Sequence, residues 1–206
     1  DLTVEGLHLA DPDAAVGWTA PFVQVFAMTW KPWHIIAAFP PDQEVALPDQ
    51  VVTLASEGMR ASVRAKPALD LPLAAVILET NRLTASSTAG WTVGAGRSVA
   101  SISADEDVPG AGDALNTYVL SLDMADVTPD PAFLARVKAV AIPDLPPSDL
   151  PQTMDRVIGS IFVTLSAPLD RHARKTKPYL ARIEVNQLNF AWGQLAATAK
   201  GLVEAD

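Results

Sequence analysis

Cysteine is absent from the 206-residue chain, and this absence removes several classes of protein at once. A chain without cysteine holds no disulfide, thiolate metal site, iron–sulfur cluster or cysteine nucleophile. Histidine is scarce too, with His8, His34 and His172 only. No two of these histidines have the i, i+2 or i, i+4 spacing that presents metal ligands on a strand or a helix. We therefore predict no metal site and no cofactor.

Basic side chains are also few, since 15 Lys and Arg face 24 Asp and Glu and give a formal net charge of −9. A nucleic-acid-binding protein needs a basic face, so we exclude nucleic acid as the main partner. No apolar run reaches the roughly 18 residues that a membrane-spanning helix needs, and no signal peptide lies within the chain. The chain begins at Asp1 in a strand-like alternation and ends abruptly at Asp206. We interpret it as a fragment of a longer chain, and an N-terminal membrane anchor before Asp1 stays open.

Helical periodicity is rare in the sequence, and the dominant hydrophobic period is two. Apolar or alternating segments bounded by turn residues predict strands at 24–28, 34–39, 45–47, 51–54, 59–64, 75–84, 93–102, 118–122, 158–165, 180–190 and 195–203. A turn is expected at Ala20-Pro21 and a hairpin turn at Pro48-Asp49. The fold class predicted is mainly β: an antiparallel, strongly twisted or curled sheet with one or two short helices.

One segment has a clear helical pattern, with prolines at its start and apolar residues at 133, 134, 137 and 140. We predict a helix within 129–140 and a second short helical turn at 150–156. The chain is treated as a single β-rich domain over 1–206. Four prolines between 143 and 151 mark a possible internal boundary.

No motif in the chain carries a recognisable reaction. The G-x-G pairs at 94–96 and 110–112 lack a third glycine and do not lie between a strand and a helix, as phosphate binding requires. Asp105, Glu106 and Asp107 form an acidic cluster in a polar loop with nothing to desolvate them. We predict that the protein is not an enzyme and has no catalytic residues.

Three tryptophans lie beside glycine or near a turn at strand ends: Trp18, Trp91 and Trp192. The favoured interpretation is that each covers an open end of the sheet. The alternative is that these rings stack on a ligand, which makes them candidate ligand-binding residues.

One segment has charge opposite to that of the whole chain. Residues 169–178 carry one acid and four basic side chains. The basic residues are Arg171, Arg174, Lys175 and Lys177. Such an asymmetry marks a candidate docking site for an anionic head group or an acidic partner. A solvated turn between two long strands is the favoured alternative.

Apolar residues make up 49% of the chain, more than one sheet with one good helix readily hides. The segments 35–39 and 74–78 are apolar on both faces. Either another layer or subunit covers one face, or that face lines an apolar groove of the kind that holds acyl chains. The sequence does not choose between these.

Several short motifs, taken in order, resemble an uncharacterised domain family of alphaproteobacterial envelope proteins. They are Gly17-Trp18-Thr19-Ala20-Pro21, His34-Ile35-Ile36-Ala37, Gly90-Trp91-Thr92-Val93-Gly94-Ala95, Pro168-Leu169-Asp170-Arg171-His172 and Leu188-Asn189-Phe190-Ala191-Trp192-Gly193-Gln194-Leu195. The final hairpin is similar to repeats in AsmA-like proteins, which are linked to lipid handling. The resemblance implies a periplasmic β domain tethered to the inner membrane, and it carries over no catalytic residues.

The expected function is therefore non-enzymatic: a periplasmic, inner-membrane-associated domain whose apolar groove binds lipid or a hydrophobic partner segment. The second hypothesis is an accessory subunit of an inner-membrane complex, with its apolar face or sheet edge covered by another chain. An enzyme ranks third, and converging polar groups in a pocket would favour it.

Overall fold

All strands of the computed structural model, which describes residues 1–11, 15–104, 116–139 and 151–204, belong to one 12-stranded antiparallel sheet. The predicted fold class is confirmed. The strands are β1 (Leu2–Asp11), β2 (Val16–Met28), β3 (Lys31–Ala38), β4 (Asp42–Leu47), β5 (Gln50–Ala65), β6 (Leu73–Ser87), β7 (Thr92–Ala95), β8 (Ser98–Ala104), β9 (Asn116–Val127), β10 (Met154–Leu165), β11 (Leu180–Trp192) and β12 (Leu195–Glu204).

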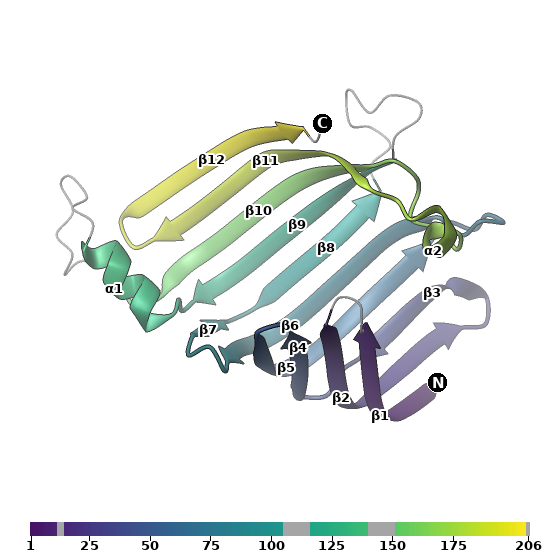
Figure 1. Ribbon diagram of the computed structural model, residues 1–206, viewed down its shortest axis with the longest axis horizontal. Coiled ribbons are helices and arrows are strands. Elements are labelled where there is room, and N and C mark those ends of the chain that lie inside the picture. Colours follow the sequence, from purple (N-terminus) through teal and green to yellow (C-terminus); the bar gives the residue numbers. More distant parts are fainter. Residues whose placement is uncertain (12–14, 105–115, 140–150, 205–206) are drawn as a thin grey trace.

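Strands that follow one another in the chain are mostly neighbours in the sheet. The order is β1-β2-β3-β5-β6-β8-β9-β10-β11-β12, while short β4 pairs with β2 and β5, and short β7 pairs with β6 (Figure 1). The predicted hairpin at Pro48-Asp49 is confirmed, because Leu47 and Gln50 pair on either side of it. Chain order and sheet order agree because short turns can join only antiparallel neighbours.

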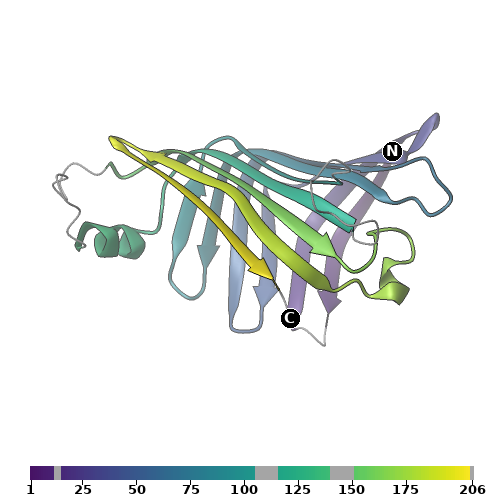
Figure 2. The same ribbon diagram turned by 90° about the horizontal axis from the view of Figure 1, so that it is seen from above.

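A crease crosses the sheet and turns it into a trough whose long sides curl toward the same side (Figure 2). Along this line four residues on separate strands have positive φ: Gly6 at 59°, Gly58 at 61°, Arg82 at 46° and Asp126 at 52°. The β5–β6 register also shifts between Ala55 and Arg60. Bulges of this kind bend a strand and raise its twist, so several of them in line fold the whole sheet.

Gly96 lets two strands meet at the crease. A Cβ atom there would lie 3.1 Å from the Ala125 carbonyl oxygen, which is tighter than an ordinary contact, so a side chain would need this neighbouring backbone to shift by a few tenths of an ångström. The Gly96 N–H instead donates to that oxygen at 2.8 Å. The single strand predicted over 93–102 is therefore two strands, β7 and β8, with the close backbone approach between them.

The turn predicted at Ala20-Pro21 is wrong, because β2 continues through both residues. Proline fits there because the ladder needs no N–H at that point. On one side the pairing with β1 passes from Ala20 to Phe22, and on the other β4 pairs only up to Thr19 and β3 only from Gln24. Proline inside a strand is tolerated where the strand bends and pairing lapses.

Of the two predicted helices, the first is confirmed as α1 (Pro131–Ala139). The second, at 150–156, is wrong over its described part, because β10 begins at Met154 and pairs with both β9 and β11. Tertiary pairing overrides a weak local preference here. The second short helix is α2 (Ala173–Thr176), inside the basic segment.

Asp130 fixes the start of α1. One of its carboxylate oxygens accepts from the N–H groups of Ala132 at 2.9 Å and Phe133 at 3.2 Å, and the other accepts from the Thr92 N–H at 3.0 Å. These bonds satisfy N–H groups that a helix start leaves without partners and tie α1 to the end of β7. The Thr92 N–H, foremost, and then the helix N–H groups lower the pKa of Asp130 below its usual 3.8.

We expect the attachment of α1 to weaken in acid. Because the pKa of Asp130 is lower in the folded chain, its stabilisation is complete above the unfolded value of 3.8 and is lost as pH falls through the folded pKa. Amide exchange at Thr92, Ala132 and Phe133 should accelerate, relative to the intrinsic exchange rate of an unfolded chain at the same pH, as the pH falls through the folded pKa of Asp130. Asp130→Asn should exchange faster at neutral pH and lose this pH response; an unchanged response would contradict the assignment.

Several of the most buried residues of the sheet lie at the crease. Its buried residues include Ala20, Val23, Pro40, Met59 and Ala95. Neither helix packs on a face of the sheet; α1 and α2 lie at opposite ends of the trough (Figure 1). The concave face is therefore not covered by any element that the structure describes.

Candidate functional site

Two rows of apolar side chains cross the concave face from strand to strand. One row joins residues that pair directly in register: Val76, Ile102, Leu120, Ile161 and Val185. A second row lies two residues further along each strand, or three on β11 because of a bulge, and its members also pair in register. They are Leu78, Ala100, Leu122, Gly159 and Leu188. Residues two apart on a strand share a face, so both rows face the inside of the trough.

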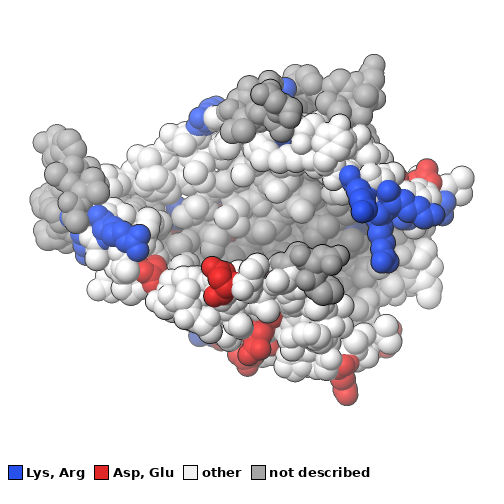
Figure 3. Space-filling model, viewed as in Figure 1, with Lys and Arg blue, Asp and Glu red and all other residues white. Residues whose placement is uncertain are grey.

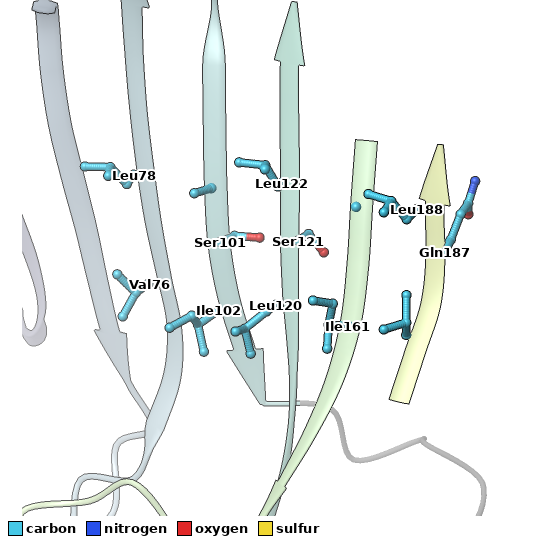
Figure 4. Close-up of a pocket in the computed structure, with 13 residues that line it drawn as sticks. Val76, Leu78, Ser101, Ile102, Leu120, Ser121, Leu122, Ile161, Gln187 and Leu188 are labelled. Carbon is cyan, nitrogen blue, oxygen red and sulfur yellow. The ribbon is translucent and has the colours of Figure 1, made fainter. Parts of the chain in front are cut away.

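These rows line a cavity of about 590 Å³ between β6 and β11 (Figure 4). Figure 3 shows the corresponding hollow between the two long rims of the molecule. The other lining residues are Ser101, Ser121 and Gln187, and no lining residue is ionisable. Strand alternation directs the side chains of Ser101 and Ser121 toward the opposite face. The cavity is within the size range of small-molecule sites, roughly 300–1,000 Å³, but it lacks the polar groups that usually orient a compact ligand.

The apolar rows continue beyond the cavity across the N-terminal strands. Val76 pairs with Val63 and Val63 with Ile35, while Leu78 pairs with Ala61 and Ala61 with Ala37. Large side chains along both rows remain open to water: Ile35, Val63, Leu122 and Leu188 are between 36% and 41% exposed. An apolar surface of this extent marks a binding surface more often than an ordinary exterior.

The opposite face is polar by comparison. In the row between the two apolar rows, Ser101 pairs with Ser121 and Ser121 with Ser160. Nearby, Arg156 and Asp123 form an ion pair at 2.7 Å, and hydrogen bonds from Arg156 hold the pKa of Asp123 below its usual value. Ile36 and Ile77 lie in the same row and are each 38% exposed, so this face is mixed in character, whereas no ionisable side chain lines the cavity of the trough.

The described residues contain no cluster of three or more His, Cys, Asp or Glu side chains that could hold a metal ion. The three histidines lie apart: His8 Nδ1 is 3.0 Å from Thr19 Oγ1, His34 Nε2 is 2.9 Å from Ser62 Oγ, and His172 Nε2 is 3.2 Å from Asp70 Oδ1. None of the described helices is long and apolar enough to cross a membrane.

The three candidate tryptophans lie at strand ends outside the cavity, each with its indole N–H bonded. Trp18 donates to Gln43 Oε1 at 3.1 Å, Trp91 to Gln50 Oε1 at 3.0 Å and Trp192 to the Pro151 carbonyl at 2.8 Å. Trp192 is only 3% exposed, and Trp18 packs edge-on against Phe39. These positions fit the interpretation that the rings cover ends of the sheet, and they give no support to ligand stacking in the groove.

The four basic candidates lie together at one end of the trough, with Arg171 before α2, Arg174 and Lys175 on it and Lys177 directly after it, and all four are exposed. Arg171 is 3.6 Å from Asp70 on the β5–β6 turn. No ion pair is found for Arg174, Lys175 or Lys177 among the residues that the structure describes. The acidic cluster at 105–107, the second G-x-G pair and residues 143–150 of the possible boundary lie outside the described residues; β9 and β10, on either side of that boundary, pair directly.

A profile of the DUF2125 family, described as an uncharacterized protein conserved in bacteria, matches residues 1–206. The chain belongs to this family. No curated protein and no solved structure matches it.

Sequence reasoning missed most of the groove in this DUF2125 chain. It singled out the apolar segments 35–39 and 74–78, but the cavity is centred on β8, β9 and β10. A signal was present. Three strands carry an apolar–serine–apolar triplet and a fourth carries Gly-Ser-Ile, and these triplets lie in the rows just described: 61–63, 100–102, 120–122 and 159–161. The serine of each triplet faces water while its neighbours face the trough.

Proposed function

We propose that this DUF2125 chain is a non-enzymatic envelope domain whose groove holds an aliphatic lipid chain. The observation that carries the proposal is the open trough lined by paired aliphatic rows without an ionisable side chain. A hydrocarbon chain needs no polar partner, so such a lining favours it over a ligand that must be oriented by hydrogen bonds. Burial of each methylene contributes about 0.8 kcal/mol.

A periplasmic position and an inner-membrane tether belong to the same proposal. They are supported by the resemblance to alphaproteobacterial envelope domains and by the AsmA-like pattern of the last hairpin. The sheet of long, consecutive strands is consistent with such a relationship.

A second candidate is an accessory subunit whose trough is covered by an apolar segment of another protein. The exposed continuation of both apolar rows over β3 and β5 favours it, because this surface extends beyond a cavity sized for a single small ligand. Here the expected finding is a stable complex recovered from solubilised membranes.

Native mass spectrometry of the purified chain and titration with a fluorescent fatty-acid probe test the first candidate. We expect a co-purifying lipid mass or saturable probe binding that an unlabelled fatty acid displaces. The absence of both, together with recovery of a stoichiometric protein partner, would reject lipid binding in favour of the subunit hypothesis.

A further inference from the structure

Three connections lie at the end of the trough away from the crease. Going along the strands from the two apolar rows and away from the crease, β3 leads to Lys31, β5 to Ala65 and β11 to Leu180, which are the strand ends that these connections join. The connections are the β2–β3 turn at 29–30, the β5–β6 turn at 66–72 and the segment 166–179 that contains α2. Figure 1 shows the β5–β6 turn and α2 together at the right-hand end of the sheet. We call these three connections the basic end.

The backbone of the basic end is held by specific hydrogen bonds. The Leu73 N–H donates to the Leu169 carbonyl at 2.7 Å, and the Leu169 N–H donates to the Tyr118 hydroxyl oxygen at 2.7 Å. His172 Nε2 lies 3.2 Å from the Asp70 carboxylate. The segment is therefore fixed to the β5–β6 turn and to β9, and its cations project from a fixed support.

The cations of this end are available to an external partner. Arg174, Lys175 and Lys177 are exposed, and no ion pair is found for them within the described ranges. Exposed Lys31, the first residue of β3, adds a charge beside the β2–β3 turn. Figure 3 shows Lys and Arg gathered over α2, whereas the whole chain carries −9. A concentrated positive patch on an acidic protein is complementary to an anionic surface.

Large apolar side chains project at the same end. Trp30 on the β2–β3 turn is 70% exposed, Leu69 on the β5–β6 turn is 87% exposed, and Tyr179 is 70% exposed. Tryptophan and tyrosine favour the interface between lipid head groups and acyl chains, and basic side chains favour anionic head groups. The two groups together have the composition of a surface that lies on a membrane.

We propose that the basic end docks on the surface of an anionic lipid bilayer, with Arg174, Lys175 and Lys177 at the head groups and Trp30 and Leu69 inserted beside them. The docking goes beyond the proposed groove function, because it requires no ligand in the groove. It would place one open end of the trough at the bilayer.

Vesicle co-sedimentation tests the docking. The wild-type chain is mixed with vesicles of phosphatidylcholine alone and of equal parts phosphatidylcholine and phosphatidylglycerol, at low and high salt. We expect binding to the anionic vesicles only, weakened by salt. Because the whole chain is used, the measured binding also contains any effect of the acidic residues in the β8–β9 connection, which lies outside the described residues.

Two variants with the same change in net charge identify the surface. Arg174→Glu with Lys175→Glu should weaken binding by about 25-fold or more, at about fivefold for each cation lost. Arg136→Glu with Lys138→Glu on α1, at the opposite end, should change it by less than about threefold. Trp30→Ala with Leu69→Ala should weaken binding by about tenfold or more without altering the charge.

Equal weakening by the two charge variants, or no binding of the wild type to anionic vesicles, would overturn the docking. In the second case an acidic protein would remain as the partner of the cations. Gly159→Phe, which fills the groove, should leave vesicle binding unchanged, so loss of the groove function and loss of docking give different results. Circular dichroism checks that each variant keeps its sheet.

Discussion

Replacing Gly159 with phenylalanine is expected to weaken binding of an acyl probe by at least about tenfold while the protein stays folded. Gly159 lies in the middle of the second apolar row, between Leu122 and Leu188. A Cβ atom added there would make ordinary contacts, at 3.7 Å from Leu188 Cδ1 and 4.0 Å from Leu122 Cβ. A larger side chain would therefore extend into the cavity and occupy the space proposed for the lipid.

Two controls separate a filled groove from a damaged sheet. Gly159→Ala adds only the Cβ atom and should keep probe binding, and it removes backbone freedom that glycine has in the unfolded chain. Ser160→Phe adds the same ring one residue along, on the opposite face, and should also keep binding. Fluorescence titration measures each variant. If Gly159→Phe binds as tightly as the wild type, the probe occupies another site.

Trp192→Ala should be the most destabilising substitution of a tryptophan in this chain. The ring is 3% exposed, and its N–H donates to the Pro151 carbonyl at 2.8 Å. Removal of a buried aromatic side chain costs about 3–5 kcal/mol in free energy of unfolding, from lost burial and from the cavity that remains. This is a large share of the roughly 5–15 kcal/mol that stabilises a typical domain.

Trp30→Ala is the matched control, because it removes the same side chain where 70% of it is exposed. Its effect on unfolding should stay within about 0.5 kcal/mol. Urea denaturation followed by circular dichroism measures both variants. Trp192→Phe should fall between them, because phenylalanine keeps an aromatic ring at this position but is smaller than tryptophan and has no N–H to donate. Equal effects at positions 192 and 30 would show that Trp192 does not hold the end of β11.

Much of the sheet could be predicted from the sequence, because period-two patterns and turn residues are local signals. The Pro48-Asp49 hairpin and the helix starting at Pro131 follow from such signals. The crease does not. Arg82 and Asp126 adopt positive φ at bulges that depend on pairing with neighbouring strands, and neither residue type demands that conformation. The turn predicted at Pro21 fails for the same reason, since only the pairing shows that no N–H is needed there.

The sequence predicted that the candidate site is an apolar surface, but it did not predict where in the sheet that surface lies. An excess of apolar residues over what one sheet hides indicated an open face, whereas locating that face needed the register that puts Leu120 beside Ile102 and Ile161. The cations after Leu169 were visible in the sequence. Their relation to Trp30 and Leu69, distant in the chain, required the topology that brings three connections to one end.

The agreement between chain order and sheet order has a consequence for how this protein assembles. Most strands pair with a strand that is adjacent or nearly adjacent in the sequence, so few pairings must wait for a distant part of the chain. Loop closure is inexpensive for such contacts, and the sheet can grow hairpin by hairpin in the order of synthesis. Each strand added along the path β3-β5-β6-β8-β9-β10-β11 also adds one residue to each apolar row, so the width of the apolar surface across the sheet rises with the number of these strands.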